Sequence, residues 1–101
     1  MVEITWTEKA KYSLKNIYEY IVLDNPVAAE KVVTEIYKQV DLLNLFPLMG
    51  YQFEHASRQN IRILLYGHYR IAYRVNNDSI DILAIIHGSM DISKYFKVYT
   101  P

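Results

Sequence analysis

Hydrophobic and polar residues alternate at the start of the chain. The opening stretch VEITW separates the apolar side chains of Val2, Ile4 and Trp6 with the polar residues Glu3 and Thr5. Successive side chains of a strand point to opposite faces, so a period of two indicates a strand with one buried face. We therefore expect a strand over this stretch.

The period changes to that of a helix after Thr7. From residue 7 to residue 24, apolar positions recur three or four residues apart, which is the spacing of one helix face. Thr7 is the expected N-cap, and Thr5 with Glu8 offers an alternative capping box. The predicted buried face consists of Ala10, Leu14, Ile17 and Ile21.

A second helix begins in the stretch DNPVAAEKV. Asp24 or Asn25 provides the N-cap, and Pro26 takes the first helical position, where its missing N–H has no consequence. Pro47 disfavours helix at the preceding residue and Gly50 permits a turn, so FPLMG ends the helix. The short connection between the helices implies an antiparallel hairpin. The predicted buried face consists of Ala29, Val32, Val33, Ile36, Val40 and Leu43.

The second half of the chain has the pattern of a sheet. Residues 51–60 show no period and are expected to form a loop, and a short helix is expected at 91–95. The resulting order predicts a single α+β domain over residues 1–101, in which the helical hairpin covers one face of an antiparallel meander. The three strands of the meander are expected at 61–65, 69–75 and 80–86.

The turns of the meander set its expected register. A three-residue turn places Leu65 opposite Tyr69, and a two-residue turn at 77–78 places Val75 opposite Ile80. Every position on the face toward the helices is then apolar or aromatic. These positions are Ile61, Ile63, Leu65, Tyr69, Ile71, Tyr73, Val75, Ile80, Ile82, Ala84 and Ile86.

The opposite face of the meander combines apolar and charged side chains. Arg74 lies opposite Asp81, which favours a cross-strand ion pair. A surface that mixes aliphatic and guanidinium groups is typical of a partner interface, and the alternative is that the last helix folds back over it. The predicted members of this face are Arg62, Leu64, Arg70, Ala72, Arg74, Asp81, Leu83, Ile85 and His87.

Composition narrows the class of protein. The 101 residues are 51% hydrophobic, which is enough for one core, and the absence of cysteine leaves no disulfide, thiol nucleophile or zinc–thiolate site. Eleven basic and eleven acidic residues cancel, unlike the strongly basic balance of many nucleic-acid-binding domains. We expect no secretory signal and no membrane span, and hence a cytoplasmic protein.

Few residues form a chemical motif. The three histidines have no ligand spacing, so no metal is expected, and no phosphate-binding glycine loop or hydrolase elbow is present, so no cofactor is expected either. Arg62, Arg70 and His87 could position a phosphate and assist RNA cleavage, or could hold an acidic peptide. Alternatively, His87 only ends a strand, and Gly88 permits the corner that follows.

Four short motifs in order identify a resemblance that covers nearly the whole chain. They are N-P-x-A-A at the second helix, F-P-x-x-G after it, Y-R-I-x-Y in the central strand, and I-x-H-G followed by Asp91. Together they resemble the ParE/RelE superfamily of toxins from bacterial type II toxin–antitoxin modules, which includes plasmid stabilisation proteins. The resemblance implies the RelE/ParE-like α+β fold and a growth-inhibiting toxin neutralised by a small antitoxin encoded beside it.

The superfamily has two branches with different targets. RelE-like members are ribosome-dependent endoribonucleases that cut mRNA, and Arg70 matches their central-strand arginine. ParE-like members inhibit DNA gyrase. The residues after Gly88 are Ser89 and Met90, where the nucleases supply an arginine, and Phe96 falls where they place a tyrosine, with Tyr95 adjacent.

This departure favours a ParE-like toxin that acts on gyrase and is not itself an enzyme. The alternatives are a RelE-type nuclease that uses Arg62, Arg70 and His87 on the ribosome, or an inactive fold retained for antitoxin binding. Pro26, Pro47, Gly50, Gly88 and Asp91 are interpreted as structural. The expected partner-binding residues are Arg62, Leu64, Arg70, Leu83, Ile85, His87 and Met90.

Overall fold

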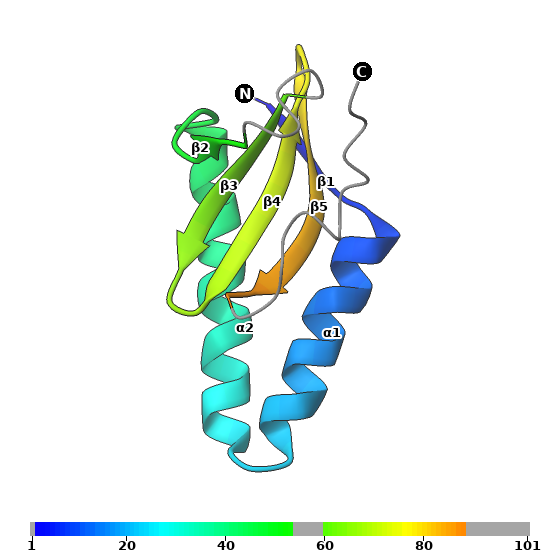
Figure 1. Cartoon of the computed structure of the whole chain (residues 1–101), viewed down its shortest axis with the longest axis vertical. Helices are drawn as coiled ribbons and strands as arrows, with labels where there is room; N and C mark the ends of the chain where they lie inside the picture. Colours follow the sequence, from blue (N-terminus) through cyan, green and yellow to red (C-terminus); the bar gives the residue numbers. More distant parts are fainter. Residues whose placement is uncertain (1, 54–59, 89–101) are drawn as a thin grey trace.

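The computed structural model describes residues 2–53 and 60–88. Figure 1 shows a helical hairpin beside a twisted sheet. The elements in chain order are β1 (Glu3–Trp6), α1 (Glu8–Val22), α2 (Pro26–Asp41), the 3-10 helix η1 (Leu42–Asn44), β2 (Tyr51–Gln52), β3 (Ile61–Tyr66), β4 (Tyr69–Val75) and β5 (Ser79–His87). The predicted short helix at 91–95 lies outside the described residues.

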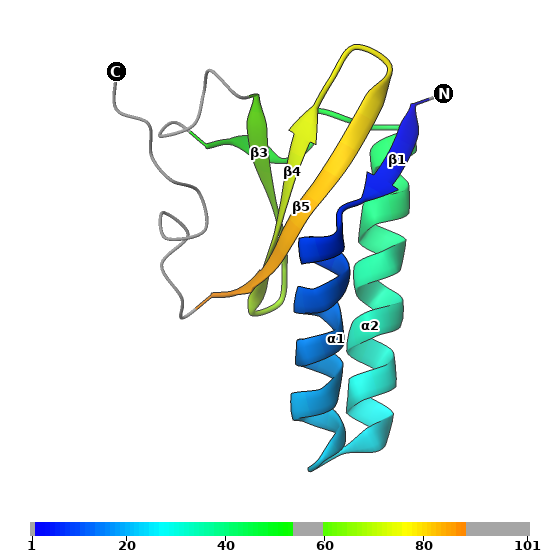
Figure 2. The same ribbon diagram turned by 90° about the vertical axis from the view of Figure 1, so that its right-hand side faces the viewer.

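In the described part of the chain, the strands form one sheet of order β1-β5-β4-β3-β2. β1 runs parallel to β5, and the other neighbours are antiparallel. Both helices lie on one side of this sheet, as Figure 2 shows. The predicted α+β architecture is therefore confirmed. The expected loop at 51–60 is corrected at its start, because Tyr51 and Gln52 pair with β3.

Side-chain caps start both helices as the sequence predicts. The Thr7 hydroxyl accepts a hydrogen bond from the Ala10 N–H, and Asn25, one of the two expected caps, accepts from the Ala28 N–H. Pro26 follows at the first helical position of α2. Each cap satisfies a backbone donor that has no partner within its helix.

The principal core lies between the hairpin and the sheet. Ala10 and Leu14 of α1 are buried, as are Ala29, Ile36 and Val40 of α2. These residues confirm the predicted faces of the two helices. The buried members of this core are Ala10, Leu14, Ile36, Val40, Leu43, Leu64, Ile71, Tyr73, Ile80, Ile82 and Ile85.

The predicted register between β3 and β4 is wrong by one residue. Tyr66, and not Leu65, lies opposite Tyr69, because the turn has only two residues. Gly67 takes the first of these positions with a φ of 54°, a conformation common in two-residue hairpins. A shift of one residue moves every β3 side chain to the other face. Arg62 and Leu64 therefore face the helices, whereas Ile61, Ile63 and Leu65 lie on the far face.

A β-bulge changes the second half of β5. Val75 lies opposite Ile80 and Arg74 opposite Asp81, as predicted, but the register shifts between Ala72 and Tyr73. Leu83 is the extra residue of the bulge, so the faces after it are exchanged. As a correction, Ile85 belongs to the core beneath the helices, and Ala84 and Ile86 belong to the far face.

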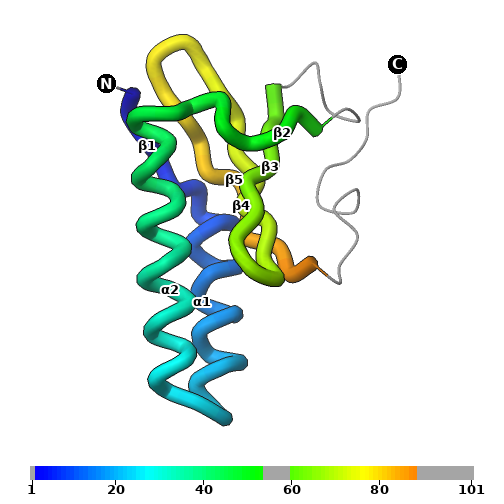
Figure 3. Tube along the Cα trace, turned by 90° about the vertical axis from the view of Figure 1, so that its left-hand side faces the viewer, coloured from blue at the N-terminus to red at the C-terminus, as the bar shows by residue number. Residues whose placement is uncertain are grey.

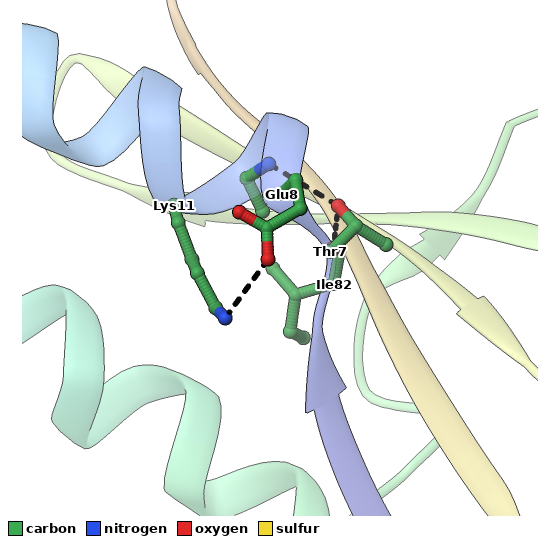
Figure 4. A network of polar contacts seen from close by, with 5 residues as sticks. Thr7, Glu8, Lys11 and Ile82 are labelled. Atoms are coloured by element: carbon green, nitrogen blue, oxygen red, sulfur yellow. Dashed lines mark hydrogen bonds and ion pairs between the residues drawn. The ribbon is translucent and has the colours of Figure 1, made fainter.

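Polar side chains of α1 satisfy the backbone groups around this bulge. The Thr7 hydroxyl donates to the Ile82 carbonyl at 2.7 Å, as Figure 4 shows. The same hydroxyl lies 3.3 Å from the Leu83 carbonyl. The Ser13 hydroxyl accepts from the Ile85 N–H at 2.9 Å. α1 is thereby attached to β5 by hydrogen bonds as well as by apolar contact.

The far face of the sheet carries a second buried cluster. Its buried members are Ile61, Ile63, Ala72, Ala84 and Ile86, with Phe53 and Leu83 packed against them. The centre of this face is therefore buried, whereas a surface open to a partner would be exposed. In residues 2–53 and 60–88, no helix is long and apolar enough to cross a membrane.

Candidate functional site

The three residues proposed for RNA cleavage do not form one site. Arg62 lies opposite Tyr73 on the face toward the helices, and Arg70 lies on the far face, opposite Leu65 and Ile86. His87 lies opposite Tyr69, four residues along β4 from Tyr73, which corresponds to about 13 Å at the rise of a strand. The expectation that the three residues share one face is wrong.

Arg62 holds the turn between η1 and β2. Its Nη1 donates to the carbonyl oxygen of Gly50 at 2.8 Å and to that of Leu48 at 3.2 Å. Its Nε is buried and has no hydrogen-bond partner among the residues that the structure describes. A guanidinium group directed at two carbonyl oxygens of its own chain acts as a brace for the backbone.

Tyr73 supports the same turn from the neighbouring strand. Its hydroxyl accepts from the Gly50 N–H and donates to the Pro47 carbonyl, both at 2.9 Å. Burial raises the pKa of Tyr73, while the Gly50 N–H and the Arg62 charge oppose that shift. The hydroxyl therefore keeps its proton at neutral pH and remains a donor to Pro47.

Gly50 fits because it has no side chain. A Cβ atom at this position would lie 2.8 Å from the Ile63 carbonyl and 2.8 Å from the Tyr73 ring and hydroxyl. The motif F-P-x-x-G supplies this turn, and the motif Y-R-I-x-Y supplies Tyr73, so the two motifs are one structural unit. The sequence predicts the structural roles of Pro47 and Gly50 but not their connection to Tyr73 and Arg62.

The turn presents apolar side chains outward. Leu45 is 73% exposed, Leu48 58% and Phe46 57%, and Met49 is exposed as well. We call Leu45–Met49 the apolar turn. It leads from the end of the helical hairpin to the β2 edge of the sheet, as Figure 3 shows. The sequence contains one indication of this apolar surface, because residues 42–53 include no charged residue.

The residues His87 and Gly88 form a corner at the other end of the sheet. The His87 ring lies perpendicular to the Tyr69 ring, with centroids 5.4 Å apart, and stacks on the His68 ring with centroids 6.3 Å apart. The Gly88 N–H donates to the His68 carbonyl. A Cβ on Gly88 would lie 2.9 Å from that carbonyl oxygen, so close backbone approach is the reason for glycine here. Burial also raises the pKa of Tyr69.

The other predicted binding residues have different surroundings. Leu64 and Ile85 are buried beneath the helices, so their assignment to a binding surface is wrong. Leu83 is half-buried at the bulge on the far face. Met90 and Asp91 lie outside the described residues.

Residues 2–53 and 60–88 hold no group of three or more His, Asp or Glu side chains that could bind a metal ion. The ion pairs Lys11–Glu8, Lys15–Glu19 and Lys38–Glu35 each join residues one turn apart in the same helix. These charged side chains are distributed along α1 and α2 and do not gather at one site. The distinctive features of the described region are therefore the braced apolar turn and the corner at His87.

Comparisons with known proteins agree with this architecture. The family model described as ParE toxin of type II toxin–antitoxin system, parDE, matches residues 4–92. A relative from Sinorhizobium fredii named as a toxin, Y4kP, is 36% identical over 85 residues, which are 84% of this chain and 86% of that protein. A chain from the chromosomal ParDE system of P. aeruginosa superimposes with a TM-score of 0.71 at 29% identity, covering 86% of this chain and 96% of that chain.

Proposed function

Because this chain belongs to the ParE toxin family of type II toxin–antitoxin systems, we propose that it inhibits growth by binding DNA gyrase and is neutralised by its co-encoded antitoxin. Both actions are protein–protein binding, and neither requires a catalytic group in the toxin. The sequence after Gly88 supports this branch of the superfamily, since Ser89 and Met90 replace the arginine expected of a nuclease.

The observation that carries the proposal is the hydrogen bonding of Arg62 to its own chain. Its guanidinium donates to the Leu48 and Gly50 carbonyls, and Arg70 lies on the opposite face of the sheet. Two arginines that face opposite sides of a sheet cannot stabilise the same phosphate in a transition state. Loss of one such donor from an active site typically lowers the rate by a factor on the order of 100 or more.

Surface exposure limits which predicted contacts remain candidates. Arg70, Leu83 and His87 keep accessible surface, so we retain them as proposed contacts of the antitoxin. Leu64 and Ile85 are withdrawn, because a buried side chain cannot meet a partner without unfolding the core. Arg62 is reassigned to the interior brace of the apolar turn.

A supercoiling assay with purified gyrase tests the proposal. We expect the wild-type toxin to inhibit supercoiling and to accumulate cleaved DNA, and we expect the co-encoded antitoxin to reverse both effects. Arg70→Ala should inhibit gyrase as wild type does. Unaffected gyrase, combined with mRNA cleavage on translating ribosomes that Arg70→Ala abolishes, would instead establish the RelE-type nuclease. Inactivity in both assays together with tight antitoxin binding would indicate the inactive binding fold.

A further inference from the structure

We infer that His68 and His87 form a two-histidine site for a divalent transition-metal ion such as Zn²⁺ at the corner of the sheet. The two imidazole rings supply two nitrogen ligands, and water or a side chain from another molecule supplies the others. This inference depends on neither gyrase nor the antitoxin as a partner.

The two rings are neighbours although they come from different parts of the chain. Their centroids are 6.3 Å apart, and their planes differ by 18°. A zinc-bound nitrogen lies about 2 Å from the ion, so two imidazoles that share one ion have centroids about 5–6 Å apart. Rotation about the side-chain torsions of the two residues therefore brings one nitrogen of each ring to a common ion.

The backbone holds the pair at this separation. His87 lies opposite Tyr69 in the antiparallel register of β4 and β5, and beyond that pair the Gly88 N–H donates to the His68 carbonyl. A Cβ on Gly88 would lie 2.9 Å from the same carbonyl oxygen, so glycine permits this close approach. Ligands fixed on adjoining backbone segments lose less freedom when they bind, and more of the contact free energy appears as affinity.

Exposure leaves both rings accessible to an ion. His68 and His87 are exposed, whereas Tyr69 is half-buried and its ring supports the His87 ring from one side, perpendicular to it at 5.4 Å. An imidazole has two nitrogens, and ligation uses one of them. The other nitrogen can therefore keep a hydrogen bond that orients the ring.

The nearest cationic residue in the sequence does not oppose a metal ion here. Arg70 lies on the far face of the sheet, opposite Leu65 and Ile86. Tyr69, the partner of His87, packs against the principal core on the other face. The sheet therefore separates the Arg70 charge from the histidine pair.

The ligand type selects the class of ion. Imidazole nitrogens suit Zn²⁺, Cu²⁺ and Ni²⁺, whereas Mg²⁺ and Ca²⁺ prefer oxygen ligands. Within residues 2–53 and 60–88, no group of three His, Asp or Glu side chains could complete a closed site. Two protein ligands leave open positions, so an ion at this corner accepts further ligands from outside. Linear spacing gives no indication of the pair, because the turn before β4 and the end of β5 supply one histidine each.

Calorimetric titration of the tag-free toxin with Zn²⁺ tests the site. We expect one ion per chain, and His68→Ala and His87→Ala should each raise Kd about tenfold or more, because the second imidazole binds as an intramolecular ligand. His55→Ala is the matched control, since it removes the third histidine of the chain, and its Kd should equal that of wild type. Titration with Mg²⁺ should show no binding to the wild-type toxin.

A second measurement separates ligation from any effect of the substitutions on folding. Each protein is unfolded thermally with and without saturating Zn²⁺, so each variant is compared with itself. An ion that binds the folded state raises Tm. We expect Zn²⁺ to raise Tm of wild type and of His55→Ala, but to change Tm of His68→Ala and His87→Ala much less.

Three results would overturn the inference. They are an unchanged Zn²⁺ affinity in either His68→Ala or His87→Ala, an equal loss of affinity in all three histidine variants, and a Zn²⁺-induced rise in Tm that survives removal of both rings. The second result would mean that Zn²⁺ binds separate surface histidines. Failure of the gyrase proposal would leave each of these measurements unaffected.

Discussion

Two polar networks hold this molecule together, one at β5 and the other at β3 and β4, and they attach different kinds of structure. The first connects α1 to β5 through the hydroxyls of Thr7 and Ser13. The second connects the apolar turn to β3 and β4 through Arg62 and Tyr73. In both networks, side chains bind backbone groups of a segment distant in sequence.

The two networks differ in what they hold. The α1–β5 network joins two elements that already share a core, and its hydrogen bonds satisfy the irregular backbone of a bulge. The turn network holds a segment whose apolar side chains face solvent. An exposed apolar turn gains little from burial, so its order depends on the brace. This contrast distinguishes a segment ordered by polar contacts from one that is also ordered by a shared core.

The largest expected effect comes from filling the space at Gly50. Gly50→Ala places a Cβ against the Ile63 carbonyl, which is a backbone group, and against the Tyr73 ring, which is fully buried. We expect a loss of about 3 kcal/mol in the free energy of unfolding. Urea denaturation measures it, with the exposed Met49→Ala as control. Equal stabilities of these two variants would contradict the close packing described for the turn.

Removal of the Tyr73 hydroxyl should have the next largest effect. Tyr73→Phe leaves the Gly50 N–H and the Pro47 carbonyl without their partner, at an expected loss of about 2 kcal/mol near pH 7. Since the pKa of Tyr73 is raised on folding, the unfolded chain loses this proton first, and wild-type stability should fall as the pH rises above about 10.

That pH dependence gives Tyr73→Phe a second readout. Phenylalanine does not titrate, so the variant should lose less stability between pH 9 and pH 11 than wild type, and Tyr69 should account for part of the remaining decline. Denaturation across this range measures both effects. Parallel stability curves for the two proteins would show that the hydroxyl is not protected as described.

The α1–β5 network should matter for stability without affecting partner binding. Thr7→Ala removes the N-cap of α1 and the donor to the Ile82 carbonyl, at an expected loss of about 1–2 kcal/mol. Thermal unfolding measures the loss. Reduced gyrase inhibition by the folded variant would contradict the division of roles between the two networks.

The smallest effect is expected at the surface beside Thr7. Lys11→Ala removes the exposed ion pair with Glu8 and should change the free energy of unfolding by less than about 0.5 kcal/mol. Measurement at low and at high salt tests this directly. A loss as large as that of Thr7→Ala would show that the charge pair, and not the cap, secures the start of α1.

The sequence predicts the helices well because periodicity and caps are local signals. Thr7, Pro26 and the buried faces of both helices all follow from spacing within a few residues. It predicts the sheet less well, because the pairing of strands depends on single residues in turns. Gly67 allows a two-residue turn, which places the β3 side chains on the faces opposite to those predicted. The bulge at Leu83 does the same for the side chains of β5 that follow it.

These two errors account for the failure of the proposed arginine–histidine site. Because of the shift in β3, Arg62 lies on the face toward the helices and not on the predicted far face. Because of the bulge in β5, His87 also lies on the face opposite to the predicted one. The brace of the apolar turn was not predictable from any short window, since Tyr73 and Pro47 are 26 residues apart. The motifs that contain them were visible in the sequence, but their mutual contact exists only in the fold.

Hydrogen exchange at the Gly50 amide tests the central claim, that the apolar turn is ordered before a partner binds. This N–H donates to the buried Tyr73 hydroxyl in the toxin alone. We predict slow exchange in the isolated toxin, little further slowing in the antitoxin complex, and fast exchange in Tyr73→Phe. Fast exchange in the isolated wild-type toxin that slows only on antitoxin binding would mean that the partner orders the turn, and would contradict this account.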